Sequence, residues 1–241
     1  MIKEITVAGI KLNNYTALEN LKRIAQNAEK HVLTVIEEVY MGTLLLAQED
    51  ETVKTVLEQT DVTVISEVDI LKAVGESTVF RKHEIEKREF FFQFMKIMNH
   101  DRSAVYLLGD DENEVNQMLE YISEEFPRLQ VIGITVLEDM NAGTEKVVNE
   151  INLMAPDMII SVLSSPLQEN FLMQNKAMLL TKVWYGLGKG RITGQKHHLR
   201  YFLMKKIREH KLMRYVKKYK DKEVTVQPST NHSADWCEEN E

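Results

Sequence analysis

Hydrophobic residues along this chain follow two different spacings, which alternate from one end to the other. Short runs rich in β-branched and aromatic residues predict strands, because such residues favour an extended backbone. Between these runs, apolar residues recur every three or four positions, which predicts helices with one buried face. The clearest helix is predicted over residues 111–126. The seven predicted strands lie within residues 5–12, 31–36, 61–66, 103–109, 129–136, 158–163 and 182–188.

The order of these elements indicates the fold class. From Ser103 to Leu163 the pattern reads strand, helix, strand, helix, strand, which is typical of two successive βαβ units. Helical spacing over residues 15–30 and 86–100 extends the pattern toward the N-terminus, and the phenylalanines of the second segment are typical of a core. We therefore predict an α/β fold with a mostly parallel sheet and helices on both faces.

Charge separates a basic C-terminal segment from an acidic body. The net charge is −7, but residues 189–220 hold twelve Lys or Arg against one Glu. That segment therefore carries +11 and the remainder −18, which predicts an anionic partner for the segment. We expect an α/β domain over residues 1–188, a basic helical appendage over 189–222 and a disordered acidic tail over 223–241.

The basic segment has two interpretations. In one, the predicted helix is solvated and docks on the body through a narrow apolar stripe. In the other, it lies on an anionic bilayer with its cations at the phosphates. No RNA-binding signature is present, and we expect no nucleic-acid partner. The stripe consists of Leu199, Phe202, Leu203 and Ile207, with Met213 and Val216 roughly continuing it.

Composition narrows the class of protein. The single cysteine, Cys237, excludes a disulfide framework and a cysteine-based metal site. We find no signal peptide, and no stretch approaches the about 18 apolar residues that span a bilayer. A chain that works in the cytoplasm, in solution or on a membrane surface is expected.

Polar residues at strand ends are the candidates for chemistry. After the apolar run 158–163, Ser165 is a predicted N-cap, Pro166 the first helical residue and Gln168 a capping-box partner. The same junction is where open α/β sheets hold ligands. The glycine-rich stretch 186–191 either makes a turn or cradles a phosphate through backbone N–H groups, with Lys189 and Arg191 nearby. Asp110 and Asp111 are candidates for helix capping or, less often, for a metal or ribose.

Several collinear segments resemble one bacterial family. They include "VAGIKLNNYTALENL", "YLLGDDENEVNQMLEYISEEFPRLQVIGI", "PDMIISVLSSPLQENF" and "WYGLGKG". The family comprises the N-acetylmannosaminyl- and N-acetylmannosaminuronosyltransferases of wall teichoic acid and surface polysaccharide synthesis. The resemblance runs roughly from Ile5 to Gly190, and its best part is the strand and turn that contain Gln168 and Glu169.

The resemblance implies a fold and a reaction. It implies a Rossmann-like body, a UDP-sugar donor and a polyprenyl-diphosphate-linked acceptor at the inner face of the membrane. Glycosyl transfer would proceed with inversion and without an essential metal or other cofactor. The basic appendage would hold the enzyme to the membrane as a peripheral protein. The oligomeric state stays open, with a homo-oligomer among the options.

Some of the family's site residues match and others do not. Thr34 matches the Thr of an early Thr-x-Asn, but the Asn position is Ile36. Ser66 falls where the family has its catalytic Asp, with Glu67 beside it and Asp69 two residues on. A Gly-x-Asp element reads Lys87–Glu89, and a Phe-Asp-Phe after the glycines is missing. Gly109, Gln168 and Glu169 are retained.

Three hypotheses follow. In the first, the chain is a membrane-associated glycosyltransferase in which Thr34 and Gln168 help to place the donor. Glu67 or Asp69 is then the base, and Lys189 and Arg191 meet the diphosphate. In the second, it is a catalytically impaired relative that binds a nucleotide sugar or acts as a scaffold at the membrane. In the third, ranked last, it is an unrelated nucleotide binder with a tail directed to nucleic acid.

Overall fold

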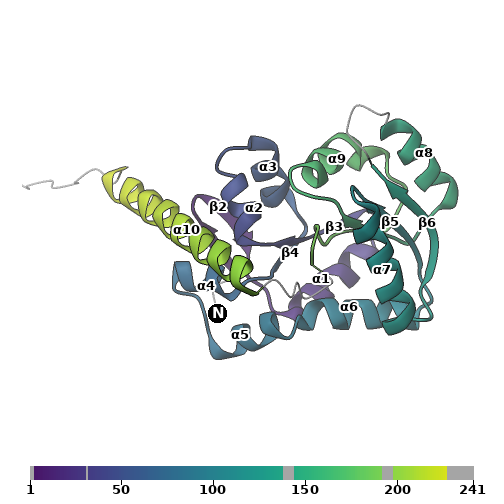
Figure 1. Cartoon of the computed structure of the whole chain (residues 1–241), viewed down its shortest axis with the longest axis horizontal. Helices are drawn as coiled ribbons and strands as arrows, with labels where there is room; N and C mark the ends of the chain where they lie inside the picture. The colour runs from purple at the N-terminus through teal and green to yellow at the C-terminus, as the bar shows by residue number, and fades with distance from the viewer. Residues whose placement is uncertain (1–2, 31, 138–143, 192–197, 227–241) are drawn as a thin grey trace, which may run out of the picture.

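The central element is a six-stranded sheet whose strands are all parallel, in the order β4-β3-β8-β7-β5-β6 (Figure 1). The computed structural model describes residues 3–30, 32–137, 144–191 and 198–226. Each run predicted as a strand overlaps at least one strand, and the parallel sheet confirms the α/β class. The strands of this sheet are β3 (Thr34–Val39), β4 (Val62–Ile65), β5 (Ala104–Gly109), β6 (Gln130–Val136), β7 (Met158–Val162) and β8 (Val183–Gly186).

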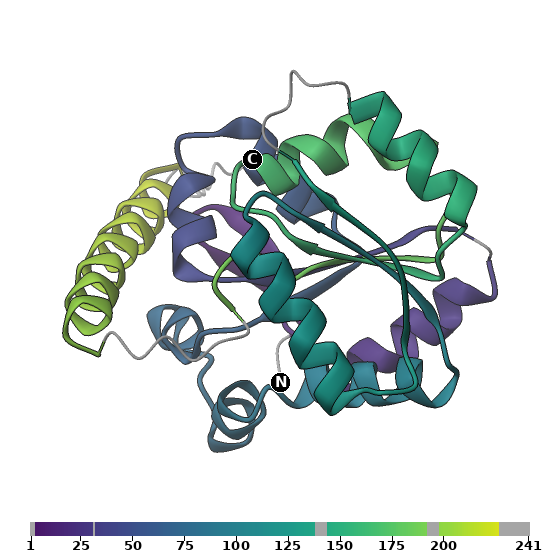
Figure 2. The ribbon, with the colours of Figure 1, turned by 45° about the vertical axis from the view of Figure 1, so that its right-hand side comes forward.

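Helices cover both faces of the sheet (Figures 1 and 2). Successive residues of a strand point to opposite faces, so Ile36 and Tyr185 join one core while Val35 and Trp184 join the other. The first core packs under α1 (Ala17–Ala28), α6 (Glu89–His100) and α7 (Glu112–Glu125). The second packs under α3 (Glu51–Gln59), α8 (Thr144–Met154) and α9 (Leu167–Asn175). The 3₁₀ turn Lys176–Met178 follows α9, and Leu179 after it joins the same core.

The first predicted strand is two strands. β1 (Glu4–Val7) and β2 (Ile10–Asn13) form an antiparallel hairpin outside the main sheet. The chain reverses at Ala8 and Gly9, both with positive φ. The sequence did not reveal this turn, because buried and exposed positions alternate in both strands and the two read as one continuous run.

Helix α10 (His198–Val226) packs against this hairpin, α2 (Met41–Leu46) and α4 (Val68–Val74). Leu212 and Val216 are buried in this third core, and Tyr219 lies against Gly9. Two ion pairs flank the contact: Lys205 lies 2.8 Å from Asp69, and Lys211 lies 3.4 Å from Glu49. The helix continues four residues beyond the expected end of the appendage, and residues 227–241 of the predicted tail lie outside the described residues.

The stripe predicted to dock this helix was correct at Val216, which is buried, and wrong at Ile207 and Met213. The side chains of Leu199, Phe202 and Leu203 lie outside the described residues. Ile207 and Met213 are exposed, whereas Leu212, assigned to another face, is fully buried. Leu, Met and Tyr occur on several faces of the helix, so spacing alone does not select one. The apolar surface of the hairpin and α2 makes that selection.

We predict that Leu212→Asp releases α10 while the body stays folded. A carboxylate at this buried position would lose its hydration, which costs several kcal/mol without a partner. Because α10 is rich in Lys and Arg, its release should increase the rate of trypsin cleavage within residues 198–226 about tenfold or more. The control is Met213→Asp at the neighbouring exposed position, and equal cleavage rates for the two variants would contradict the docking described above.

Candidate active site

A pocket of about 500 Å³ lies at the carboxyl ends of β3, β7 and β8. Its walls come from the end of β3, the turn after β7, the turn after β8, α2 and α10. From β3 the chain moves outward to β4 at one edge of the sheet, and from β5 it moves outward to β6 at the opposite edge. The direction of winding therefore reverses in the middle of the sheet, where β8 and β7 lie. Crevices at such changes of direction are where open α/β sheets bind ligands. The pocket is therefore the candidate active site.

The glycine-rich turn does not offer its backbone to a phosphate as one interpretation expected. The N–H groups of Leu187 and Gly188 both donate to the Ser161 carbonyl, at 3.0 and 3.2 Å. Lys189 N–H donates to the Leu163 carbonyl at 3.2 Å, and Gly190 N–H donates to the Glu114 carboxylate at 3.0 Å. These four donors hold β8 against β7 and α7, so the N–H groups of residues 187–190 are not available to an anion.

Among the residues that the structure describes, four cations line the pocket, against the two carboxylates Glu38 and Glu49. Lys189 and Arg191 come from the turn after β8, and Arg208 and Lys211 come from α10. The Arg191 guanidinium lies 3.5 Å from the centre of the Tyr40 ring, a cation–π contact. Its Nε is buried and has no hydrogen-bond partner among the described residues. The wall can therefore donate to an anion.

Lys189 is held in place by acids. Its ammonium lies 3.1 Å from Asp111 and 3.7 Å from Asp110. Partial burial lowers the pKa of Lys189, but the hydrogen bond to Asp111 and the charges of Asp110, Asp111 and Glu114 outweigh that effect, and the pKa is raised. Asp111 also caps α7 by accepting the N–H groups of Asn113 and Glu114, which confirms the capping interpretation.

Glu37 is a carboxylate buried beneath the pocket. Its oxygens accept hydrogen bonds from Trp184 Nε1 at 2.8 Å and from Gln168 Nε2 at 2.6 Å. Burial, with the neighbouring Glu169 charge, raises the pKa of Glu37 to about 8 despite these donors. Gly186 lies against this carboxylate, and a Cβ there would come within 2.0 Å of it.

Glu38 points to the opposite face of β3 and lines the pocket. One oxygen accepts the Tyr185 hydroxyl at 2.7 Å, with the Arg88 guanidinium 3.7 Å away. The other accepts the Ser66 hydroxyl at 3.0 Å and the Tyr40 hydroxyl. Burial and the Glu38 charge raise the pKa values of both tyrosines well above the usual range. With both oxygens engaged, Glu38 serves as the acceptor that fixes its neighbours.

Comparison with known proteins gives this pocket a context. The sequence profile described as "Glycosyl transferase WecG/TagA/CpsF family" matches residues 5–191. The chain belongs to this family. It is also similar to an "N-acetylglucosaminyldiphosphoundecaprenol N-acetyl-beta-D-mannosaminyltransferase" of Staphylococcus aureus (strain MRSA252). The two are 25% identical over 192 residues, which cover 77% of this chain and 73% of the relative.

The three candidates for a base in this family member lie in different surroundings. Ser66 follows β4 and donates to Glu38. Glu67 accepts the N–H of Met41, the first residue of α2, at 2.6 Å and so connects the ends of β4 and β3. Asp69 points to Lys72 and Lys205, each 2.8 Å away. Although partial burial raises the pKa of Asp69, these lysines outweigh it and lower the pKa, so Asp69 anchors α10.

Thr34 is not brought to the pocket. It is the first residue of β3, and its N–H donates to the Lys182 carbonyl at the amino end of the sheet. Strand β3 continues through Val39, so the side chains at its carboxyl end are Glu38 and Tyr40. The sequence prediction ended this strand at Ile36, which placed the Thr-x-Asn match at the carboxyl end of the strand. In the structure Thr34 lies at the amino end instead.

Gln168 lines the pocket and Glu169 is buried next to it in the chain, but the predicted helix start was wrong. Helix α9 begins at Leu167, and no side chain caps it. The Ser165 hydroxyl instead donates to Glu169 at 2.5 Å, while Gln168 points inward, accepting from Ser161 and donating to Glu37. Burial raises the pKa of Glu169.

Gly109 ends β5, next to Asp110. A Cβ at this position would lie 2.3 Å from the Val115 side chain, so the glycine allows α7 to approach the sheet. This packing accounts for the residue without a ligand. Among the described residues, no group of three or more His, Cys, Asp or Glu side chains is arranged to hold a metal ion.

The residues that sequence reasoning missed are Glu37, Glu38 and Tyr40. A signal was present in "TVIEEVY", where two consecutive acids interrupt an apolar run. A charged pair inside a buried parallel strand requires partners on both faces of the sheet. Charged residues lie more often outside strands than inside them. The predicted strand therefore ended before Glu37, and the two acids were assigned to the segment that follows.

We predict that Glu37 makes the protein less stable as pH rises. Its pKa is about 8 when folded and 4.5 in the unfolded reference, so between these values only the unfolded chain loses the proton. Stability is therefore lost from about pH 4.5 to pH 8, by an amount on the order of a few kcal/mol. In Glu37→Gln this loss should disappear, and a flipped Gln168 amide can restore the hydrogen bonds. Denaturant unfolding at pH 5 and pH 8 measures it, with exposed Glu58→Gln as control; equal pH dependence in both variants would refute the assignment.

Proposed function

We propose that this chain is a glycosyltransferase that moves an N-acetylmannosamine-type sugar from a UDP-sugar to a polyprenyl-diphosphate-linked acceptor. The observation that carries the proposal is a pocket at the carboxyl end of the sheet with four cations on its walls. A leaving diphosphate develops negative charge, and preorganised cations stabilise it. Family membership and the name of the staphylococcal relative support the same reaction.

The positions of the pocket residues indicate which part of the reaction each one serves. Lys189 and Arg191 reach the donor diphosphate from the turn after β8, and Arg208 and Lys211 reach it from α10. An acceptor hydroxyl attacks the anomeric carbon, and the bond from that carbon to the diphosphate breaks with its electron pair leaving on UDP. The hydroxyl proton passes to a carboxylate. Attack from the face opposite the leaving group inverts the anomeric centre, and no metal ion is required.

Glu67 is the carboxylate that we assign to the proton. It lies at the end of β4 beside the first turn of α2, one residue from Ser66 at the Glu38 cluster. Asp69 is committed to two lysines, and Glu38 is saturated with donors. A general base needs a lone pair that is free to take a proton. Glu67 lies behind the pocket-lining residues, and among the described residues its side chain accepts one hydrogen bond, from Met41 N–H, which leaves it less engaged than either neighbour.

The membrane side of the proposal rests on α10. The described residues that line a groove of about 900 Å³ along this helix include five cations and one acid. Cations in such an arrangement attract anionic headgroups. No helix in the described part of the chain combines the length and apolar character of a membrane span. We place the protein at the inner face of the membrane, held through its surface. The cations are Lys211, Arg214, Lys217, Lys218 and Lys222.

A second candidate function is a nucleotide-sugar-binding or scaffold protein without turnover. The observation that favours it is the engagement of the pocket carboxylates: Glu38 is saturated, Asp69 is paired, and Glu67 already holds the N–H of Met41. Under this alternative the donor binds but is not consumed.

For binding, we predict that Lys189→Ala and Arg191→Ala each weaken UDP about tenfold to a hundredfold, because a charge-assisted hydrogen bond is lost. Calorimetry measures the affinity. The control is Lys182→Ala, which removes a cation at the amino end of β8, where it pairs with Asp157. Loss of affinity in the control, or none in the pocket variants, would place the nucleotide elsewhere.

For turnover, we predict that Glu67→Gln lowers kcat by about 10²- to 10⁴-fold and leaves UDP affinity unchanged. Asp69→Asn is the matched control and should retain the chemical step. The assay follows UDP release and sugar transfer to short-chain polyprenyl-diphosphate N-acetylglucosamine in detergent. Donor binding by the wild type without any transfer would instead favour the scaffold alternative.

A further inference from the structure

Helix α5 (Val79–Glu86) exposes two consecutive large apolar side chains in its first turn. Val79 is 89% exposed and Phe80 is 60% exposed. Among the described residues, Val79 is the most exposed of the large hydrophobic side chains. We call this pair the apolar tip. Exposed lysines, Lys82 and Lys87, follow it on the same helix and at its end.

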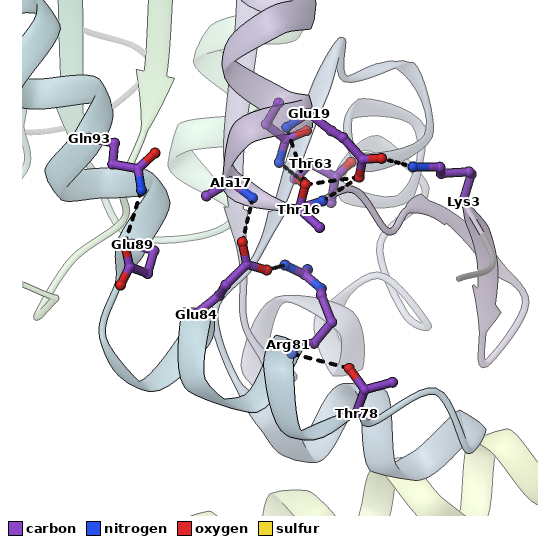
Figure 3. Close-up of polar contacts among 11 residues, drawn as sticks. Lys3, Thr16, Ala17, Glu19, Thr63, Thr78, Arg81, Glu84, Glu89 and Gln93 are labelled. Atoms are coloured by element: carbon purple, nitrogen blue, oxygen red, sulfur yellow. Dashed lines mark hydrogen bonds and ion pairs between the residues drawn. The ribbon is translucent and has the colours of Figure 1, made fainter.

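The apolar tip is held rigidly in its exposed position. The Thr78 hydroxyl caps α5 by accepting the Arg81 N–H at 3.1 Å. The buried Arg81 guanidinium donates to Glu84 at 2.7 Å, and the other Glu84 oxygen accepts the Ala17 N–H at the start of α1, at 3.0 Å (Figure 3). Turning the tip inward would break this buried ion pair, which is strongly unfavourable. The exposure is therefore built into the fold.

The apolar tip lies at the same end of the molecule as the basic helix. α5 follows α4, and α4 contacts α10 through the Asp69–Lys205 pair. Figures 1 and 2 both show α4 beside α10 and α5 next to α4, with α8 at the far end of the body. α10 itself exposes Met204 and Ile207 among its cations. Apolar and cationic groups thus occur together at this end.

We propose that the apolar tip inserts into the interfacial region of an anionic bilayer, as a second membrane contact beside α10. This inference rests on the proposed function, which requires access to a lipid-linked acceptor. A protein held to a bilayer by one cationic helix binds weakly, and the whole body can turn about the axis of that helix. A second contact off that axis fixes the orientation of the body. Paired weak signals of this kind are how peripheral proteins achieve stable binding. Arg208 and Lys211 belong both to α10 and to the pocket, so the fixed orientation presents the pocket to the bilayer.

The test uses the single cysteine of the chain. In a Cys237→Ser background, Val79→Cys carries an environment-sensitive fluorophore, and Leu153→Cys carries it in the control. Leu153 is 87% exposed but lies on α8, at the opposite end. With vesicles of phosphatidylglycerol and phosphatidylcholine, we expect a blue shift and increased emission from position 79 alone. An unshifted label at position 79 on protein that sediments with the vesicles overturns the proposal and leaves α10 as the membrane contact.

A second measurement tests whether the contact contributes to binding. The double variant Val79→Ser, Phe80→Ser should lower vesicle affinity about tenfold, whereas Leu153→Ser should not change it. Equal affinity of the double variant and the wild type overturns the proposal, as does failure of the wild type to sediment with vesicles. A blue shift without vesicles that grows with protein concentration would show that a second copy covers the tip. The transfer assay in detergent reports the proposed function independently.

Discussion

Two adjacent carboxylates buried in strand β3 dominate the architecture of the site. Because successive side chains of a strand point to opposite faces, Glu37 and Glu38 must be satisfied by different layers of the molecule. Glu37 takes its donors from β8 and α9, and Glu38 takes its donors from β8 and from the residues that directly follow β4 and β3. An unsatisfied buried carboxylate would be very costly. These contacts therefore fix how the ends of β3, β4, β7 and β8 meet.

That arrangement determines what remains available for a ligand. The backbone donors of the turn after β8 are used to join β8 to β7 and α7, and the acids beneath the pocket are used to organise the aromatic and amide groups around them. The groups left for an anion are side-chain cations, and they come from the turn after β8 and from α10, the next described element of the chain. Such a wall suits a diphosphate, which is large, flexible and doubly charged.

Helix α10 links the pocket to the surroundings of the protein. One side of it is anchored by Leu212, Val216 and the Asp69–Lys205 pair, part of it lines the pocket, and its outer side is cationic. The pair with Lys205 gives Asp69 a structural role, which is to anchor α10. The proposed membrane contacts of α10 and the apolar tip lie at the same end of the body. The way the protein binds the membrane would therefore determine how the pocket faces the bilayer.

The sequence by itself determined the class of fold, the positions of nearly all strands and the separation of a basic segment from an acidic body. These follow from local spacing and composition, which read directly along the chain. It also placed Gln168, Lys189 and Arg191 at strand ends that line the pocket. Tertiary structure alone decided that β3 extends to Val39, because an acidic pair is admitted to a buried strand only when Trp184, Gln168, Tyr185 and Ser66 arrive from elsewhere. It also decided which face of α10 is buried, since several faces are apolar and the hairpin selects one.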